Sequence, residues 1–166
     1  MVPVHRENPA RAVSSETQYS LMEFMRKFQP SLTQFVREFP DDEACLQWLW
    51  RNHYSPDGEH APCPKCERKR PFRRYATSQR RRCWTCVACG YHLYPTAGTI
   101  FHKSSTALYV WFYAMYLMAS TRCAISAKQL ERELGVTYKT AWRMSNLVSN
   151  AFATNRLTRQ LYTVMA

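Results

Sequence analysis

Two C-x-x-C pairs constrain the fold of this chain more than any other feature. Cys63 and Cys66 form the first pair, Cys86 and Cys89 form the second, and nineteen residues separate them. Each pair can place two thiolates on one tight turn, and two such turns complete a tetrahedral zinc site. Gly90 follows the second pair and supports this register, because glycine lets the backbone turn and aim N–H groups at sulfur. The sequence therefore predicts one zinc ion held by four cysteines.

Two alternatives to this ligand set can be weighed from the sequence. Cys83 also forms a C-x-x-C pair with Cys86, but no glycine follows that pair and Cys83 lies in a predicted strand. A redox dithiol is disfavoured because such motifs usually occur as one pair in a βαβ context. A site closed by four thiolates has no open coordination position, so the zinc is expected to be structural and not catalytic.

Basic residues gather between the two cysteine pairs. The 166-residue chain has a formal net charge of +11, and eight of its 23 Lys and Arg residues lie in this interval, opposed only by Glu67. Phe72, Tyr75 and Trp84 interleave with them, so the segment offers guanidinium groups for phosphates and rings for stacking or packing. The alternative is that these charges only solvate an exposed loop. The candidate DNA contacts in this segment are Arg73, Arg74, Arg80, Arg81 and Arg82.

A second basic element, residues 125–150, has the spacing of a helix-turn-helix. Ser126 is placed to cap a first helix, Gly135 to end it in the left-handed conformation, and Thr137 to cap a second helix. The residues expected to face inward are Leu130, Leu134, Val136, Ala141, Met144 and Val148. The residues expected to face DNA are Tyr138, Lys139 and Arg143. Helix pairs joined at glycine also occur without nucleic acid, so this signal alone leaves the function open.

Helices are predicted on both sides of the cysteine-rich segment. The segment after Pro40 begins with three acids suited to a helix N-terminus, and one stripe of that helix is apolar: Cys45, Leu46, Leu49, Trp50 and His53. Residues 104–121 carry no charge and predict a helix with a serine at its start. Its apolar centre is shorter than the roughly 20 residues that a bilayer requires, so we expect a buried helix.

The expected fold is a small α+β protein. Zinc-ribbon β-hairpins flanked by α-helices are followed by a three-helix helix-turn-helix unit. We expect residues 1–38 to be a tail or a loosely packed helix and residues 39–100 to form a helix plus the zinc ribbon. Residues 101–153 are assigned to the helix-turn-helix domain and residues 154–166 to a tail. The N-terminal residues lack the apolar stretch of an export signal. We therefore expect a cytoplasmic, nucleoid-associated bacterial protein with reduced thiols and no membrane partner.

Five segments carry a resemblance to a known family. In chain order they are FPDDEACLQWL, CPKC, WTCVACGYHLYPTAGTIFHKSSTAL, WFYAMYL and ISAKQLERELGVTYKTAWRM. Together, residues from about 39 to 150 resemble the N-terminal region of bacterial insertion-sequence transposases that begin with a zinc ribbon. The resemblance implies that Cys63, Cys66, Cys86 and Cys89 bind zinc. It also implies that the ribbon and the helix-turn-helix bind DNA at terminal inverted repeats, and that a ribonuclease-H-like catalytic domain follows.

That catalytic domain is not expected in this chain. No Asp or Glu follows Val148, and the three acids at 41–43 point in different directions at a helix start, so they cannot converge on two metal ions. The sequence thus predicts a truncated, non-enzymatic, zinc-dependent DNA-binding module without catalytic residues. Its expected partners are double-stranded DNA and an intact transposase. The alternative left open is a small zinc-ribbon transcription regulator or an RNA-binding protein.

Overall fold

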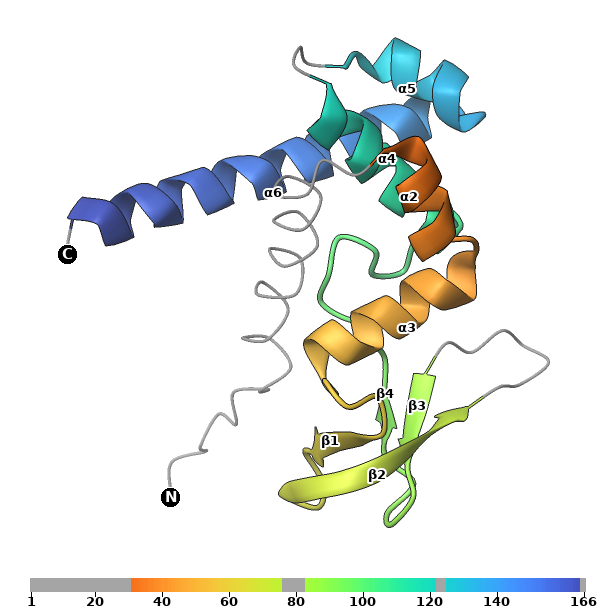
Figure 1. Ribbon diagram of the computed structural model, residues 1–166, viewed down its shortest axis with the longest axis vertical. Coiled ribbons are helices and arrows are strands. Elements are labelled where there is room, and N and C mark those ends of the chain that lie inside the picture. The colour runs from red at the N-terminus through yellow and green to blue at the C-terminus, as the bar shows by residue number, and fades with distance from the viewer. Residues whose placement is uncertain (1–30, 76–82, 122–124, 165–166) are drawn as a thin grey trace, which may run out of the picture. The chain divides into compact units, whose positions relative to one another are not determined.

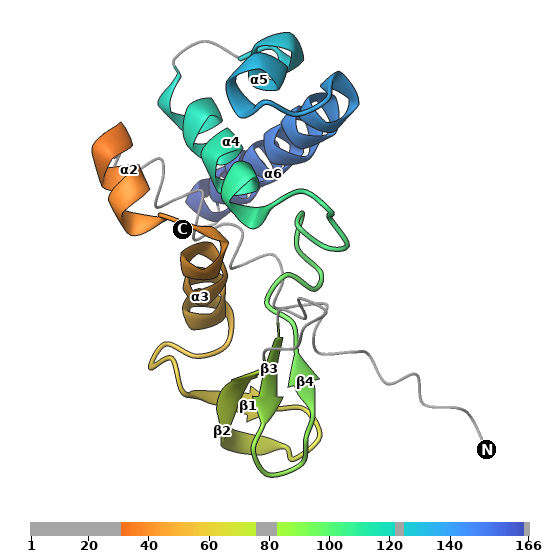
Figure 2. The same cartoon turned by 90° about the vertical axis from the view of Figure 1, so that its right-hand side faces the viewer.

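A computed structural model describes residues 31–75, 83–121 and 125–164 of the chain, the last thirteen of these as helix backbone only. This part contains five α-helices and one four-stranded antiparallel sheet, so the prediction of a small α+β fold is confirmed (Figures 1 and 2). The contacts divide it into two compact units. One unit runs from Leu46 to Lys103, and the other combines the described residues up to Cys45 with those from Ser104 onward.

The first unit is built around the sheet, whose strands follow one another in space in the same order as in the sequence. Its strands are β1 (His60–Cys63), β2 (Arg68–Tyr75), β3 (Cys83–Cys86) and β4 (His92–Leu93). Neighbouring strands pair antiparallel throughout. Such a meander needs only short connections, and two of them are the C-x-x-C turns.

Aromatic rings from helix α3 (Asp42–His53) form the core on one face of this sheet. Trp50 stacks on Trp84 with ring centroids 4.6 Å apart and planes 3° from parallel, and it also contacts Phe72 at 5.6 Å. The Trp50 indole N–H donates to the carbonyl oxygen of Gly58 at 2.9 Å, so its polar atom is satisfied. The predicted apolar stripe of this helix is buried at all five positions: Cys45, Leu46, Leu49, Trp50 and His53.

The second unit contains helices α2 (Leu32–Glu38), α4 (Leu108–Ser120), α5 (Ala127–Leu134) and α6 (Tyr138–Val164). Helix α2 is more firmly anchored than its weak sequence pattern suggested. Phe35 is 1% exposed, and its ring contacts Tyr109, Tyr113 and Tyr116 of α4. One aromatic side chain inserted among three tyrosines therefore holds a seven-residue helix that lacks an extended apolar stripe.

The start of α4 differs from the prediction of a serine cap. The helix begins at Leu108 after Ala107, which provides no side-chain cap. The carboxylate of Asp42 instead accepts the backbone N–H of Tyr109 at 2.8 Å, so a residue distant in the sequence caps this helix. The hydroxyl of Ser104 accepts the Trp111 indole N–H at 2.9 Å and the backbone N–H of Thr106 at 3.2 Å.

Helices α5 and α6 are joined by a turn with the predicted capping geometry. The Ser126 side chain accepts the backbone N–H of Gln129, and Gly135 ends α5 with φ 62° and ψ 29° in the left-handed region. Ile125, Leu130 and Ala141 form the buried core between these helices. Further along α6, Met144 and Val148 are also fully buried, as their spacing predicted.

Helix α6 continues to Val164, through most of the segment 154–166 that the sequence analysis assigned to a tail. Figure 1 shows this helix extending past α4 and α5. Its 27 residues contain neither glycine nor proline, so no residue in it stops the helix. Within the described residues, no helix is both long enough and apolar enough to cross a membrane.

Candidate metal centre and nucleic-acid interface

Four cysteine sulfur atoms converge at the two C-x-x-C turns. The Sγ atoms of Cys63, Cys66, Cys86 and Cys89 all lie within 4.8 Å of one another. Two of the distances are 3.5 Å, between Cys63 and Cys89, and 4.0 Å, between Cys66 and Cys86. A tetrahedral zinc with Zn–S bonds of about 2.3 Å separates its sulfurs by about 3.8 Å. The spacing and the soft thiolate donors therefore fit a four-coordinate zinc ion.

The two turns have the same backbone geometry, and we call them the first knuckle (residues 63–67) and the second knuckle (residues 86–90). In each, the residue after the second cysteine donates its N–H to the carbonyl oxygen of the first cysteine. Glu67 donates to Cys63 at 2.8 Å, and Gly90 donates to Cys86 at 2.9 Å. Both residues have positive φ, 52° for Glu67 and 71° for Gly90. The left-handed conformation of Gly90 thus recurs at Glu67, where an L residue adopts it.

The surroundings shift the pKa values of Cys63, Cys66 and Cys89 in different directions. Burial raises the pKa of the Cys63 thiol, and the hydrogen bond that Cys66 makes with Cys89 raises the pKa of Cys66 to about 12. The backbone N–H of Tyr91 lowers the pKa of Cys89 to about 7. Four thiolates this close together repel one another strongly unless a cation lies between them. A divalent metal ion supplies that charge and favours ionisation of all four.

The remaining described cysteines lie apart from this cluster. Cys83 is the first residue of β3 and is fully buried, and its sulfur does not belong to the converging group. Cys45 is buried in α3. Among the described residues, the four knuckle cysteines are the group of His, Cys, Asp and Glu side chains placed to hold a metal ion.

Asp57 ties the entry of the sheet together. Its carboxylate accepts the Ser55 hydroxyl at 2.7 Å and the backbone N–H groups of Glu59 and His60 at 3.0 and 2.8 Å. The Lys69 ammonium lies 3.3 Å away. These donors stabilise the ionised form, and the N–H of His60 has the largest effect, so the pKa of Asp57 lies far below its ordinary value. The carboxylate therefore fixes the loop from which β1 begins.

The predicted DNA-contacting arginines of the cysteine-rich segment have different surroundings. Arg73 is exposed on β2. Arg74 is half-buried: its guanidinium lies 4.8 Å from the centre of the Trp84 ring and donates to the carbonyl oxygens of Tyr75 and Cys83 at 3.2 and 3.1 Å. Part of the hydrogen-bonding capacity of the Arg74 guanidinium is therefore used within the protein. The other three candidates, Arg80, Arg81 and Arg82, lie outside the described residues.

The start of α6 presents the three predicted contacts at the surface. Tyr138, Lys139 and Arg143 are all exposed, and the Lys128 ammonium of α5 lies 5.9 Å from the centre of the Tyr138 ring. The sequence prediction missed Trp142, which is 56% exposed. Residues four apart share a helix face, so an aromatic pair (138 and 142) lies beside a basic pair (139 and 143). The sequence did contain a signal for Trp142: it lies between Ala141 and Arg143, at a position where the helical pattern predicts a polar surface residue.

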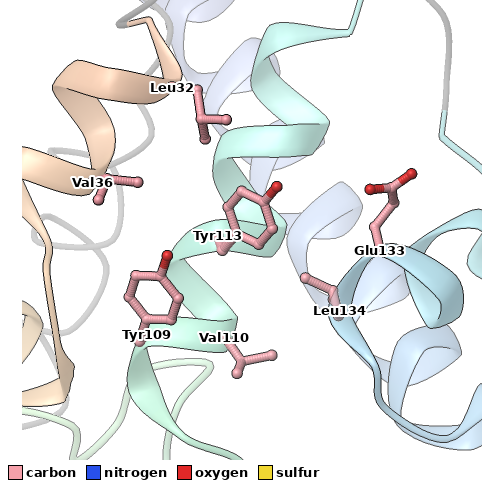
Figure 3. Close-up of a pocket in the computed structure, with 7 residues that line it drawn as sticks. All are labelled: Leu32, Val36, Tyr109, Val110, Tyr113, Glu133 and Leu134. Carbon is pink, nitrogen blue, oxygen red and sulfur yellow. The ribbon is translucent and has the colours of Figure 1, made fainter.

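A groove in the second unit is the other concave feature of interest. It has a volume of about 350 Å³, and its walls come from α2, α4 and α5 (Figure 3). Its lining residues are Leu32, Val36, Tyr109, Val110, Tyr113, Glu133 and Leu134. Among the described residues of this lining, Glu133 is the acidic one, and the others are apolar or tyrosine.

Comparison with known proteins finds a relative in a transposable element. Over 109 residues it is 33% identical to an uncharacterised protein in the transposable element ISH50 of Halobacterium salinarum, an alignment that covers 66% of this chain and 34% of that protein. The chain thus spans about a third of the length of this relative. No family model and no solved structure matches the chain.

Proposed function

We propose that this chain is a zinc-dependent DNA-binding module of a transposable-element protein, similar to the N-terminal region of an insertion-sequence transposase. The carrying observation is the exposed aromatic and basic face at the start of α6. It follows a tight turn from α5 and is held there by a buried core, as in a helix-turn-helix that inserts its second helix in the major groove. The similarity to a protein of a transposable element supports the same reading.

In this proposal the metal centre has a structural role. Zinc closes both knuckles and holds the short strands beside them, so that Arg73 is carried on an ordered surface. The four sulfurs would fill the coordination sphere of zinc and leave no position for a reactive water. We therefore assign DNA binding and not strand cleavage to these residues, with the terminal inverted repeats of the element as the proposed target.

Binding selection tests the proposal. Zinc-loaded protein is used to enrich duplexes from a random pool, and affinity is then compared between the selected and the unselected duplexes. Lys139→Ala and Arg143→Ala should each cost about 1–3 kcal/mol on the selected duplex and much less on the unselected pool, because a base contact discriminates while a phosphate contact does not. Arg37→Ala is the matched control, since it removes one exposed charge from α2.

Two results would contradict the proposal. The first is a selection that enriches no duplex at all. The second is that Lys139→Ala loses the same affinity on the selected and the unselected duplexes, and no more than Arg37→Ala loses. In that case α6 would contribute only its positive charge to binding. A structured RNA of the same length, measured alongside, separates DNA binding from the alternative of an RNA-binding protein.

A further inference from the structure

The face of the sheet opposite Trp84 carries a row of polar, aromatic and basic side chains. Arg73 of β2, Thr85 of β3 and His92 of β4 are direct cross-strand partners, so they project to the same face. Tyr75 lies two residues after Arg73 on β2 and shares that face. Its ring centroid lies 5.1 Å from that of His92, which places these two rings side by side on the sheet surface.

This row is both ordered and accessible. The hydroxyl of Thr85 and Nδ1 of His92 are 2.7 Å apart, and this hydrogen bond fixes the imidazole against the sheet. Tyr75 is 37% exposed and Tyr94 is 40% exposed. Burial alternates from His92 to Pro95, so Tyr94 continues on the side of His92. Cys83 shares the face but is fully covered, which places the open part of the surface at the two tyrosines and Arg73.

The chemistry of this surface indicates an anionic ligand with flat rings. Strands β2, β3 and β4 contain no Asp or Glu, and Arg73 adds an exposed guanidinium. Sheet faces that combine exposed aromatic rings with basic groups bind single strands by stacking unpaired bases on the rings while cations contact the phosphates. A base within a duplex is stacked on its neighbours on both sides and cannot use such a face.

We propose that this face of the sheet binds unpaired nucleobases of a single strand, with Tyr75 and Tyr94 as stacking residues and Arg73 as a phosphate contact. The choice of ligand class rests on the proposed nucleic-acid function, but the site is separate from α6. The chain then has two binding surfaces with different preferences: α6 for duplex and the sheet for a single strand.

The test compares zinc-loaded wild-type chain and variants by fluorescence anisotropy, with three probes. These are a deoxythymidine oligomer, an abasic oligomer with the same number of phosphates, and a blunt duplex. We expect the wild type to prefer the deoxythymidine oligomer to the abasic one. Tyr75→Leu and Tyr94→Leu should each reduce that preference at least about five-fold, and Tyr→Phe at either position should keep it, because the ring and not the hydroxyl stacks. Binding to the duplex should not change.

Tyr91→Leu is the matched control. Tyr91 is 37% exposed, as is Tyr75, but it directly precedes His92, so the alternation of side chains along the chain directs it to the opposite face. The inference is overturned if Tyr75→Leu and Tyr94→Leu keep the preference for the deoxythymidine oligomer over the abasic one. It is also overturned if Tyr91→Leu loses that preference to the same extent. Zinc content, measured for every variant, identifies a leucine variant that has lost the fold. At such a position the phenylalanine variant must retain the preference for the deoxythymidine oligomer, and its loss overturns the inference. A uridine oligomer distinguishes RNA from DNA as the source of the bases.

The outcomes for the two proposals are separable. Duplex selection that depends on Lys139 and Arg143, together with equal binding of the deoxythymidine and abasic oligomers, removes the single-strand site and leaves the proposed function. Ring-dependent binding of the deoxythymidine oligomer without any duplex selection removes the proposed duplex-binding function and leaves the single-strand site.

Discussion

Glu67 and Gly90 occupy equivalent positions in the two knuckles, and the difference between them can be measured. Both have positive φ, a region that costs an L residue about 1–2 kcal/mol. Glu67→Gly should therefore raise the free energy of unfolding by up to about 1 kcal/mol, and Gly90→Ala should lower it by about 1 kcal/mol or more. Urea unfolding of the zinc-loaded protein measures both.

Two features of the knuckles provide the controls. A Cβ added at Gly90 would meet no atom within 4 Å, so any cost of Gly90→Ala comes from the backbone and not from a clash. Lys65 is exposed in the first knuckle and does not have positive φ. Lys65→Gly should thus destabilise the protein, because it only adds freedom to the unfolded chain. If Lys65→Gly stabilised the protein as much as Glu67→Gly, the left-handed conformation of Glu67 would not be the cause of the gain in unfolding free energy.

Asp57 gives a prediction with a defined pH range. Because its pKa is lowered on folding, the stability it contributes is present above the ordinary carboxyl value of about 4 and is lost as the pH falls through the lower folded value. Asp57→Asn should therefore lower the Tm of the zinc-loaded protein at every pH from 5 to 7. Glu59→Gln is the control, since Glu59 contributes its backbone N–H to this loop. Equal Tm values for Asp57→Asn and wild type would contradict the prediction.

At the scale of elements, β2 carries a prediction about phosphate contacts. If Arg73 neutralises one phosphate of the bound DNA, Arg73→Ala should reduce the slope of log K against log salt by about 0.9 for a duplex or about 0.7 for a single strand, equally for every sequence. Arg74→Ala differs, because the Arg74 guanidinium also binds two carbonyl oxygens and covers the Trp84 ring, so its removal should lower the stability of the sheet as well. Anisotropy titrations at several salt concentrations and thermal unfolding separate the two effects. A salt slope unchanged in Arg73→Ala would remove it from the interface.

Elements with strong local signals could be predicted from the sequence, and those that depend on distant partners could not. The turn at Gly135 and the cap at Ser126 are local features and were found at the expected residues. The cap of α4 comes from Asp42, 67 positions away, which no local pattern reveals. Helix α2 depends in the same way on Phe35 finding three tyrosines of α4. In the candidate site, cysteine spacing indicated the cluster, whereas the exposure of Trp142 and the shared face of Tyr75 and His92 needed the fold.

For the whole molecule, we expect one tightly bound zinc ion per chain. Closing a four-thiolate site supplies on the order of 10 kcal/mol of apparent binding free energy, which short strands cannot obtain from their own packing. Serine at any of the four knuckle cysteines should abolish stoichiometric zinc and unfold the sheet, whereas Cys83→Ser and Cys45→Ser should retain the metal. Elemental analysis of purified chains with circular dichroism measures both. Zinc retained by Cys89→Ser and lost by Cys83→Ser would show that the ligand set is wrong.

The arginine-rich strand β2 has a consequence for the lifetime of the chain. Residues 68–71 of β2 pair with β1 and residues 72–75 pair with β3, and both of these partner strands end in candidate zinc-ligand cysteines. Proteases cleave extended, unpaired backbone, so the peptide bonds of β2 are protected as long as the strands hold. Removal of the metal would release a segment dense in cleavage sites after Lys and Arg. The supply of zinc in a cell would then set how long each copy survives degradation, and through that how many copies are present at a given time.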